Sequence, residues 1–567
     1  MYVKINVLPF SGSRTEITMD RFHPSSYEVT KTGVNITTED KELAFFIEKA
    51  ERLCIENKAD FCGIPVLREG AKYDGVWLET QPMGGEMYAC RDAVTALGNH
   101  LMFMKYQRRD GKMPGMISRS YPWRGVTPHH DWMQGDFFSR SALRMYYLVN
   151  RDKRYLELLY VALRDFDDYL WTYRDTDGDG CLETYCTWDT GDDNNTRLIS
   201  RGVGAHEHGC ARSEEPPTNV GDMPFESAEY MAYSYSQRSV LAEISDILGN
   251  GEGDVWRKKA EEVKKRFKEY LWDSEKGAAY DRDRNNEMMY VLSLENIKCM
   301  YHGIFSQEMA DEFIRRHLMN PDEFFTPLPL PNIAANDVCF HLDETRNNFT
   351  DEIREKVKLL AAGDMGDNSW SGPVQGLSNQ RVIDALLNYG HHAELTLIAR
   401  RWLGNLKRAE KYTQQYDPYT GAAPEKGMDG YGPTMLSALE DINFLIGIDY
   451  ASGRFTVSSG AKEADSSFTQ HIFGSDYVLT RKSGKAVLTK DNETVLTFTG
   501  GARIMLDEKL NVISVCGMEP TVQDFKLTIG DKTYGTTLNP NDIYEIKDGV
   551  LSLKTQTPFS CPKGVTE

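Results

Sequence analysis

The segment WDTGDDNNTR, residues 188–197, places three carboxylates within five residues, beside an indole and a guanidinium. Its Gly and Asn residues interrupt any regular pattern, so we expect a loop rather than a helix face. A carboxylic acid near apolar surface or near a second carboxylate has a raised pKa and can stay protonated near neutral pH. Trp188, Asn194 and Arg197 are candidates for binding a sugar ring and its hydroxyls. The alternative interpretation is a solvated turn.

Around this loop, hydrophobic periodicity predicts a mainly helical chain over residues 39–450. A cap at Thr38–Asp40 precedes the first apolar residues at helical spacing. A dozen or so helices in consecutive pairs can close into an (α/α)6 toroid, with the long loops gathered at one end. The principal helices are expected over residues 86–106, 137–149, 155–173, 227–248, 255–271, 292–317, 349–361, 379–389, 393–406 and 433–448.

The two ends of the chain differ in character from this helical part. Residues 1–38 alternate at period two in places and are expected to be an extended N-terminal segment. Residues 451–567 contain strand-like runs separated by Ser-Gly and Asp-Asn turns, which predicts a small antiparallel β-sandwich domain. We therefore expect three parts: the N-terminal segment, the catalytic barrel at 39–450 and the C-terminal β-domain.

Composition limits the classes of function. The net charge of −20 argues against nucleic acid or an anionic membrane as partner. No apolar run is long enough to span a bilayer, and Met1–Ile5 does not begin a signal peptide. The 10 cysteines contain no C-x-x-C pair, so we expect reduced thiols in a cytoplasmic protein. Motifs for binding nucleotides or for a serine hydrolase are absent from the sequence.

Four segments in chain order resemble the motifs of glycoside hydrolase family 63 and the related trehalases. Residues 189–197, DTGDDNNTR, resemble the family signature E-S-G-x-D-N-S-P-R and the trehalase motif E-S-G-W-D-F-S-S-R. Residues 369–375, SWSGPVQ, with Asn379 are similar to W-x-G-P-V-W-x-x-x-N. Residues 416–421, YDPYTG, resemble Y-D/N-P-x-T-G, and residues 430–434, GYGPT, stand where the family has F-G/S-W-T/S.

This resemblance implies an (α/α)6 barrel and an inverting glycosidase that acts on α-linked sugars. Inversion requires two carboxyl groups roughly 6.5–9.5 Å apart, with a water between the base and the anomeric carbon. By the resemblance, Asp193 is the general acid that protonates the leaving oxygen. Asp189 stands where the family has Glu and is expected to contact the substrate, Arg197 matches the family arginine, and Asp192 replaces a hydrophobic residue.

The position of the general base departs from the family. The family has Glu three residues before the D/N of Y-D/N-P, whereas this chain has Gln414, and a neutral amide cannot take a proton from water. A neighbouring carboxylate is the favoured replacement, with Glu425 the first candidate and Glu410 the second, while Gln414 would hold the water or a sugar hydroxyl. Alternatively, the protein is an inverting phosphorylase, whose phosphate nucleophile is already anionic, or a sugar-binding protein without turnover.

Further substrate contacts follow from the same resemblance. Trp370 would stack on the sugar and Gln375 would bind its hydroxyls, although a core position for Trp370 is the alternative. Trp132, Gln134 and Asp136 lie in a loop that family barrels use for substrate, but this match is loose and an ordinary exposed loop explains the same residues.

Two segments raise the question of a metal. Asp175–Gly180, DTDGDG, begins like a calcium loop, but the twelfth position is Cys186 rather than Glu, so a rigid Asp/Gly turn is favoured and Ca²⁺ stays the alternative. His206–Cys210, HEHGC, offers His and Cys ligands without a standard zinc spacing. We therefore expect no metal or other cofactor.

The sequence thus predicts a cytoplasmic O-glycosidase, α-glucosidase- or α-mannosidase-like, acting on a small oligosaccharide or glycoside. By the resemblance, a large N-terminal β-domain is common in its relatives, and we expect this chain to lack it. A homo-oligomer, in which a neighbouring subunit caps the pocket, is left open.

Overall fold

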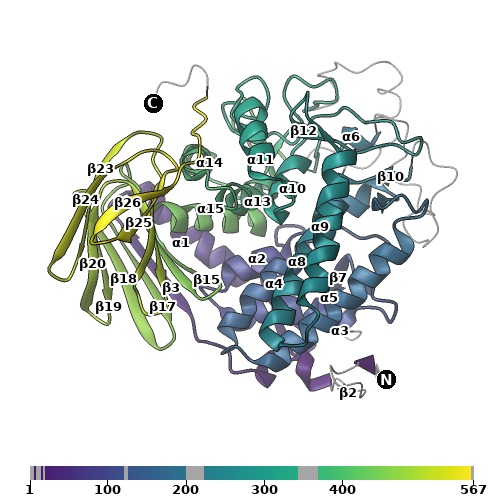
Figure 1. Cartoon of the computed structure of the whole chain (residues 1–567), viewed down its shortest axis with the longest axis horizontal. Helices are drawn as coiled ribbons and strands as arrows, with labels where there is room; N and C mark the ends of the chain where they lie inside the picture. The colour runs from purple at the N-terminus through teal and green to yellow at the C-terminus, as the bar shows by residue number, and fades with distance from the viewer. Residues whose placement is uncertain are drawn as a thin grey trace.

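The computed structural model describes residues 6–7, 15–16, 19–119, 125–193, 195–199, 223–342 and 368–562. A helical body forms one part of the molecule, and a β-rich part that carries strands β15 to β26 lies at its left (Figure 1). The predicted helix at residues 349–361, Asn194 and the segment His206–Cys210 lie outside the described residues.

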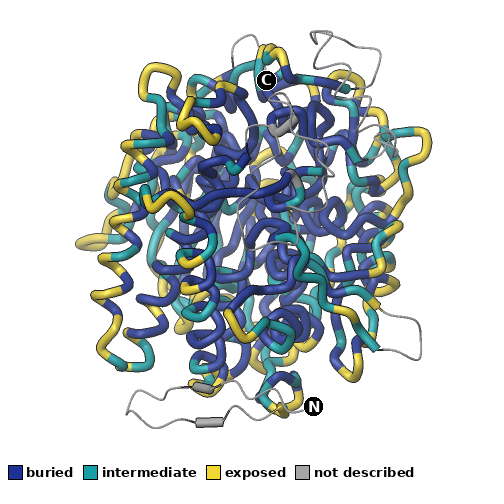
Figure 2. The backbone as a smooth tube through the Cα atoms, turned by 90° about the vertical axis from the view of Figure 1, so that its right-hand side faces the viewer, coloured by how far each residue is buried: buried dark blue, intermediate teal, exposed yellow. Residues whose placement is uncertain are grey.

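Six of the described helices pack against one another in a closed circuit, in the order α2, α4, α8, α10, α13, α15 and back to α2. Most side chains of these helices are buried, and the interior of the helical body is dark blue in Figure 2. These helices are α2 (Gln81–Tyr88), α4 (Ser139–Met145), α8 (Ala228–Leu248), α10 (Glu295–His302), α13 (Gly376–Leu387) and α15 (Gly432–Ile446).

Other helices pack on the outside of this circuit. Helix α9 packs along α8, and α14 packs on both α13 and α15. These outer elements are α1 (Lys41–Glu56), α3 (Ala93–Tyr106), α5 (Lys153–Tyr173), α9 (Gly253–Tyr270), α11 (Gln307–Phe313) and α14 (His392–Ala409), with the short α6 (Thr196–Ile199) in the loop region. The observed arrangement is a helical barrel.

The single helix predicted over residues 86–106 is wrong, because the chain breaks between Tyr88 and Ala93 into α2 and α3. The Oδ1 atom of Asp92 accepts the backbone N–H groups of Val94 and Thr95, both at 3.1 Å. These are donors that the first turn of a helix leaves unpaired, so Asp92 starts a new helix. Similarly, the predicted helix at 292–317 is divided, because Gly303 ends α10 in a left-handed conformation.

Two antiparallel sheets form the β-rich part. The six-stranded sheet has the order β15-β16-β21-β22-β25-β26, and the seven-stranded sheet has the order β24-β23-β20-β19-β18-β17-β3. The predicted strands at 477–481, 485–489 and 494–498 are present as β18, β19 and β20. The strands are β15 (Ile448–Ala451), β16 (Arg454–Ser459), β17 (Ser466–Ile472), β18 (Ser475–Lys482), β19 (Lys485–Lys490), β20 (Glu493–Thr499), β21 (Ala502–Asp507), β22 (Val512–Gly517), β23 (Gln523–Ile529), β24 (Lys532–Leu538), β25 (Ile543–Lys547) and β26 (Val550–Thr555).

Strand β3 (Gly33–Thr38) comes from the N-terminal region and pairs with β17, with Thr38 opposite Ser466. Residues 33–38 are therefore the edge strand of the C-terminal sheet rather than part of a separate extended segment. Backbone hydrogen bonding between these distant segments ties the start of the described chain to its end.

Short strands and turns connect the helices. The strands are β1 (Asn6–Val7), β2 (Thr15–Glu16), β4 (Lys58–Phe61), β5 (Ile64–Leu67), β6 (Gly75–Trp77), β7 (Met116–Arg119), β8 (Val126–His129), β9 (Glu183–Thr184), β10 (Phe225–Glu226), β11 (Trp272–Asp273), β12 (Ala278–Ala279), β13 (Val374–Gln375) and β14 (Gln415–Tyr416). The short helical turns are η1 (Met19–Phe22), η2 (Pro24–Ser26), η3 (Tyr146–Leu148), η4 (Thr187–Thr190) and η5 (Ile314–Leu318).

Two expectations from composition, on membrane-spanning segments and on cysteines, can be compared with the described residues. In the ranges that the structure describes, no helix combines the length and the apolar character needed to cross a bilayer. The cysteines of the described residues are free thiols.

Arg400 on α14 joins the helical barrel to the β-rich part. Its Nε atom lies 2.8 Å from Glu463 Oε1, and its Nη2 atom lies 2.8 Å from Glu519 Oε1, whose side chain is 1% exposed. We expect Arg400→Met to lower the free energy of unfolding by about 3 kcal/mol, because it leaves a buried carboxylate without its cation. Urea unfolding followed by circular dichroism measures this change.

The matched control is Arg257→Met, because Arg257 also pairs with two carboxylates but is 50% exposed. We expect a far smaller effect there, since solvent screens exposed pairs. Equal effects of the two substitutions would contradict a supporting role for Arg400.

Candidate functional site

The loop that carries residues 188–197 begins at the end of α5 and passes through β9 and η4. Gly191 follows η4 with φ of 75°, and a Cβ atom at this position would lie 1.8 Å from Glu79 Oε2. A side chain here would therefore be excluded both by the left-handed backbone and by the close carboxylate. The turn at Gly191 directs the next residues, Asp192 and Asp193, into the interior of the helical barrel.

Asp189 is fully buried beneath this loop. Its Oδ2 atom lies 2.6 Å from Arg174 Nη1 and accepts the Tyr185 N–H at 2.9 Å, and its Oδ1 atom accepts the Met133 N–H at 2.9 Å. Although burial opposes the charge, Arg174 and the backbone donors outweigh it and hold the pKa of Asp189 below its ordinary value. Protein groups thus occupy both carboxylate oxygens, which points to a loop anchor rather than to the expected substrate contact.

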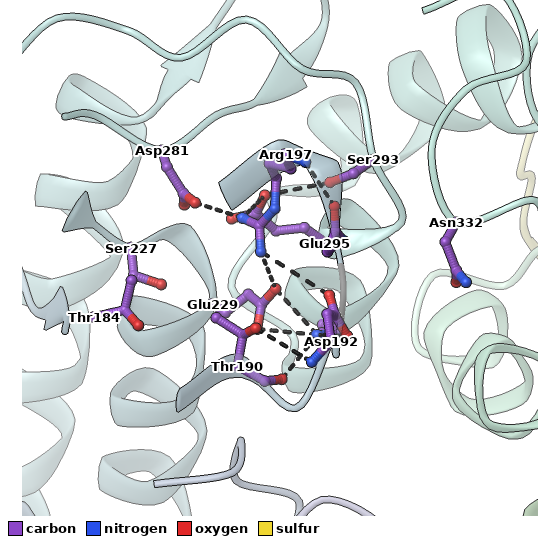
Figure 3. A network of polar contacts seen from close by, with 12 residues as sticks. Thr184, Thr190, Asp192, Arg197, Ser227, Glu229, Asp281, Ser293, Glu295 and Asn332 are labelled. Carbon is purple, nitrogen blue, oxygen red and sulfur yellow. Dashed lines mark hydrogen bonds and ion pairs between the residues drawn. The ribbon is translucent and has the colours of Figure 1, made fainter. Parts of the chain in front are cut away.

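Arg197 is the centre of a buried ionic network (Figure 3). Its guanidinium contacts Asp281, lies 2.6 Å from Glu295 Oε2 and lies 3.1 Å from Glu229 Oε1. Its side chain is 2% exposed, so these acids rather than a sugar account for its contacts. The network fastens the loop to α8, which carries Glu229, and to α10, which carries Glu295.

Asp192 extends this network to a second cation. Lys298 Nζ lies 2.7 Å from Asp192 Oδ1 and 3.0 Å from Glu229 Oε2. Arg381 on α13 lies 3.8 Å from Asp192 Oδ1 and 3.3 Å from Glu79 Oε2. The carboxylate that replaces a hydrophobic residue of the family is therefore matched by buried cations.

Asp193 is held differently from its neighbours. Its Oδ2 atom accepts a hydrogen bond from Asn368 Nδ2 at 3.0 Å, and its backbone carbonyl accepts the Trp370 N–H at 3.2 Å. Burial raises the pKa of Asp193 to about 6, the charge of Asp192 adds to this shift, and Asn368 and Lys72 oppose it. This carboxyl group can hold a proton in weakly acidic solution.

Gln414 lies in the same hydrogen-bonded chain as Asp193. Its Nε2 atom donates to Asn368 Oδ1 at 2.8 Å, and its Oε1 atom accepts the Tyr73 hydroxyl at 2.7 Å. Asn368 therefore touches Asp193 with one end of its amide and Gln414 with the other. The structure thus brings the two family positions for acid and base to one shared partner.

Glu425 and Glu410, the candidates for the base, are exposed side chains. Glu410 ends α14 with φ of 54°, its backbone N–H donates to the Leu406 carbonyl, and its own carbonyl accepts a hydrogen bond from Lys49. In the described part of the chain, no hydrogen bond or ion pair joins the Glu425 side chain to the residues around Asp193. The structure does not bring either carboxylate into contact with the chain of Asp193, Asn368 and Gln414.

Trp370 and Gln375 are buried close to Asp193. Trp370 is 3% exposed, and its indole N–H donates to Asn368 Oδ1 at 3.2 Å. Gln375 precedes α13, and its Nε2 atom donates to the Ser369 carbonyl at 2.8 Å. Its buried Oε1 atom has no hydrogen-bond partner among the described residues, so it is available to a hydroxyl donor.

The loop before α4 contributes the remaining predicted contacts. Trp132 and Trp188 meet edge to face with centroids 5.5 Å apart, and the buried indole N–H of Trp132 has no acceptor among the described residues. Gln134 Nε2 donates to Glu79 Oε1 at 3.0 Å, and Asp136 Oδ1 accepts the Phe138 N–H at 2.9 Å. Gln134 and Asp136 are buried, so the interpretation of this loop as an exposed cluster is wrong for these two residues.

Two buried glutamates close to Asp193 were missed in the sequence. Burial raises the pKa of Glu69 to about 8, although the Tyr431 hydroxyl, which donates to its Oε1 at 2.8 Å, opposes this shift. Burial also raises the pKa of Glu79 well above its ordinary value, and the charges of Glu69 and Asp193 add to the shift. The only local signal for Glu79 is an isolated acid between apolar residues in WLET, residues 77–80.

Small cavities flank these residues. One, of about 10 Å³, is lined by Lys72, Tyr73, Gln414 and Tyr431, and another of about 10 Å³ by Asp192, Trp370 and Arg381. Each has room for about one water molecule. A larger cavity, of about 530 Å³, lies between the helices and the β-rich part, where Glu86, Arg144 and Asp449 line it, away from Asp193.

Asp189→Asn tests whether Asp189 anchors the loop or contacts the substrate. We expect it to lower the free energy of unfolding by about 3–5 kcal/mol, because Arg174 keeps a buried charge without its carboxylate. Chemical denaturation measures this loss. Unchanged stability together with a raised KM would instead assign Asp189 to the substrate.

Comparison with known proteins agrees with this geometry. Residues 89–433 match the family described as "Mannosylglycerate hydrolase MGH1-like glycoside hydrolase domain". The cytosolic neutral trehalase of Kluyveromyces lactis is 25% identical over 191 residues, which are 32% of this chain and 22% of the trehalase. The chain therefore aligns with about a fifth of that relative's length.

Solved structures show the same fold. The family 63 mannosylglycerate hydrolase of Thermus thermophilus, in complex with glucose, superimposes with a TM-score of 0.56 at 17% identity, over 70% of this chain and 99% of that chain. A protein named sialidase superimposes with a TM-score of 0.60 at 12% identity, over 85% of this chain and 42% of that chain. Because the family match covers more than half of the sequence, the chain belongs to the mannosylglycerate hydrolase MGH1-like glycoside hydrolase domain family.

Proposed function

We propose that this protein is an inverting glycoside hydrolase that cleaves the α-glycosidic bond of a small oligosaccharide or glycoside. Asp193 is the general acid in this proposal. The closed circuit of α2, α4, α8, α10, α13 and α15 supports an (α/α)6 toroid with these as the inner helices. The names of the matched proteins, a mannosylglycerate hydrolase and a trehalase, favour an α-mannosidase- or α-glucosidase-like substrate.

The observation that carries the proposal is the environment of Asp193. Its half-buried carboxyl group has a pKa of about 6, and a single side-chain amide, that of Asn368, binds it. A general acid works best when its pKa lies near the working pH, because it must hold the proton and still release it in the transition state. Asp189, four residues earlier, has the opposite shift and cannot fill this role.

The proposed base is a carboxylate of the 410–425 segment, with Glu425 first and Gln414 as the group that holds the water. The exposed position of Glu425 requires the substrate-bound loop to bring its carboxylate towards Asn368 and Gln414. Glu69 is an alternative candidate for the base, because its carboxyl group lies close to Asp193. Its pKa of about 8 leaves most of it protonated at neutral pH. A base in that state is ineffective until the solution is alkaline.

Phosphorolysis is the second candidate function, and two observations favour it. Gln414 is neutral and hydrogen-bonded at both ends of its amide. Lys72 lines the same small cavity as Gln414, and its charge acts on Asp193. A cation beside a neutral amide suits an anionic nucleophile better than it suits the activation of water.

An assay with and without phosphate distinguishes these functions. Hydrolysis releases a free sugar from an α-linked disaccharide or mannosyl glycoside in phosphate-free buffer, whereas phosphorolysis requires phosphate and releases a sugar 1-phosphate. Binding detected by calorimetry without either product, over a panel of α-disaccharides and α-glycosides, would indicate a sugar-binding protein.

Asp193→Asn tests the acid. We expect kcat/KM to fall at least about 100-fold, because proton donation to the leaving oxygen is lost. Thermal unfolding should change little, since Asn retains the shape and still accepts the Asn368 hydrogen bond. The control is Asp531→Asn, an exposed acid of the β-rich part, which should leave both measurements unchanged. Near-normal turnover in Asp193→Asn would refute the assignment.

Asn368→Ala tests the cause of the acid's pKa. Because Asn368 donates to the charged carboxylate, its removal raises the pKa of Asp193 above about 6. The general acid acts while protonated, so the alkaline limb of the kcat/KM profile should move to higher pH. A limb that stays in place while kcat falls would show that Asn368 acts on Gln414 or the substrate instead.

A further inference from the structure

The Asp-rich turn after α5 has the local geometry of a cation-binding loop. Asp177 Oδ1 accepts the Asp179 N–H at 3.1 Å, and Asp179 Oδ1 accepts the Cys181 N–H at 2.8 Å. One carboxylate oxygen from each of Asp175, Asp177 and Asp179 lies within 4.8 Å of the others. Gly178, between Asp177 and Asp179, and Gly180, directly after Asp179, have φ of 75° and 84° and open space around the position of a Cβ atom.

A second set of carboxylates meets this turn from the short sheet of β9 and β10. Glu183 on β9 lies directly opposite Glu226 on β10 in the strand register. Oxygen atoms of Glu183, Glu226 and Asp177 also lie within 4.8 Å of one another. Asp177 therefore belongs to both sets and links the acids of the turn to those of the short sheet.

Glu226 gives an independent indication of a ligand. The residue is 4% exposed, and its Oε2 atom has no hydrogen-bond partner among the described residues. A buried carboxylate oxygen without a partner is costly, and more so beside Asp177 and Glu183. By contrast, Glu183 Oε1 and Oε2 accept hydrogen bonds from the side chain and backbone of Thr176, at 2.7 and 3.1 Å. Glu226 thus brings to the carboxylate cluster a buried side chain that is only partly hydrogen-bonded.

We propose that Asp175, Asp177, Asp179, Glu183 and Glu226 form a calcium site. Counted from Asp175, Asp177 and Asp179 take the third and fifth positions of an EF-hand loop, and Gly180 takes the sixth, where the loop requires glycine. The backbone carbonyl of Cys181 takes the seventh and Glu183 the ninth. The twelfth position, Cys186, cannot supply the bidentate carboxylate of an EF-hand, and Glu226 supplies it from β10 instead.

The donor set selects the cation. All side-chain ligands are carboxylates, which favours a hard cation such as Ca²⁺ over zinc. Five acids that can approach from several directions suit the six to eight oxygen ligands of Ca²⁺ better than the strict octahedron of Mg²⁺. Arg266 Nη2 lies 2.6 Å from Asp179 Oδ2 and offsets one of the negative charges. The remaining acids still carry a large excess of negative charge.

The site joins the ends of the loop that contains Asp189 and Asp193. Glu183 precedes Asp189 by six residues, and β10 leads into α8, which carries Glu229 of the Arg197 network. A bound Ca²⁺ would fix β9 against β10 and so fix the base of this loop. This inference rests on the carboxylate cluster and does not depend on which glycosidic reaction the protein catalyses.

The test uses the full chain, treated with a chelator and then dialysed. Isothermal titration with CaCl₂ should show one site, and Ca²⁺ at 100 times its Kd should raise the Tm by roughly 2 °C for a chain of this length. In Glu226→Gln, we expect the Kd to rise at least about tenfold. The metal-free Tm of this variant should not fall, because the substitution keeps the shape of a buried carboxyl group whose Oε2 atom has no partner among the described residues.

Glu261→Gln, an exposed acid on α9, is the matched control and should bind Ca²⁺ like the unmodified protein. Three results would overturn the proposal: no heat and no Tm shift with CaCl₂, an unchanged Kd in Glu226→Gln, or an equal Tm shift when Mg²⁺ replaces Ca²⁺. A lower metal-free Tm in Glu226→Gln would also count against it, because the charge of Glu226 would then be stabilised by the protein alone.

Discussion

The ion pairs of Arg197 are the interaction on which the loop around Asp193 depends. One guanidinium holds Asp281, Glu229 and Glu295 within hydrogen-bonding distance in the interior of the helical barrel (Figure 3). Because desolvation offsets much of the attraction in a buried pair, such a network stabilises a fold only weakly. Its effect is to specify position: the loop can lie only where the charges of α8, α10 and the chain after β12 are all matched.

Asp189 and Asp193 show how one loop gives two different properties to the same side chain. Asp189 is fully buried and Asp193 is half-buried, so desolvation disfavours the charge of each. Asp189 has a guanidinium and two backbone N–H groups as partners, and these outweigh desolvation. Asp193 has one neutral amide, which does not. The anchor is thereby kept charged, and the candidate acid is kept close to its protonated form, as its proposed role in proton donation requires.

Local signals in the sequence were sufficient for much of this structure. Caps and apolar spacing predicted most helices, and alternation predicted β18 to β20. Contacts between distant segments were not predictable in the same way. The pairing of β3 with β17 joins residues far apart in the chain, and Asn368 reaches Asp193 from a different loop. Asp189 and Arg197 matched family motifs, but only the positions of Arg174, Asp281 and Glu295 show that both are held by protein groups.

The neutral amides of Gln414 and Asn368 limit which groups can supply the negative charge of the nucleophile in the proposed reaction. A carboxylate at position 414 would lie one amide away from Asp193, and its charge would raise the pKa of that acid further. With Gln414 the acid has no such neighbour, and the amide can orient a nucleophile through hydrogen bonds but cannot take its proton. In the proposed reactions, the charge therefore arrives with the nucleophile or from a carboxylate that approaches only in the complex. In both cases the nucleophile gains its negative charge at a different step from the one at which Gln414 orients it. This separation follows from the neutral side chain of Gln414.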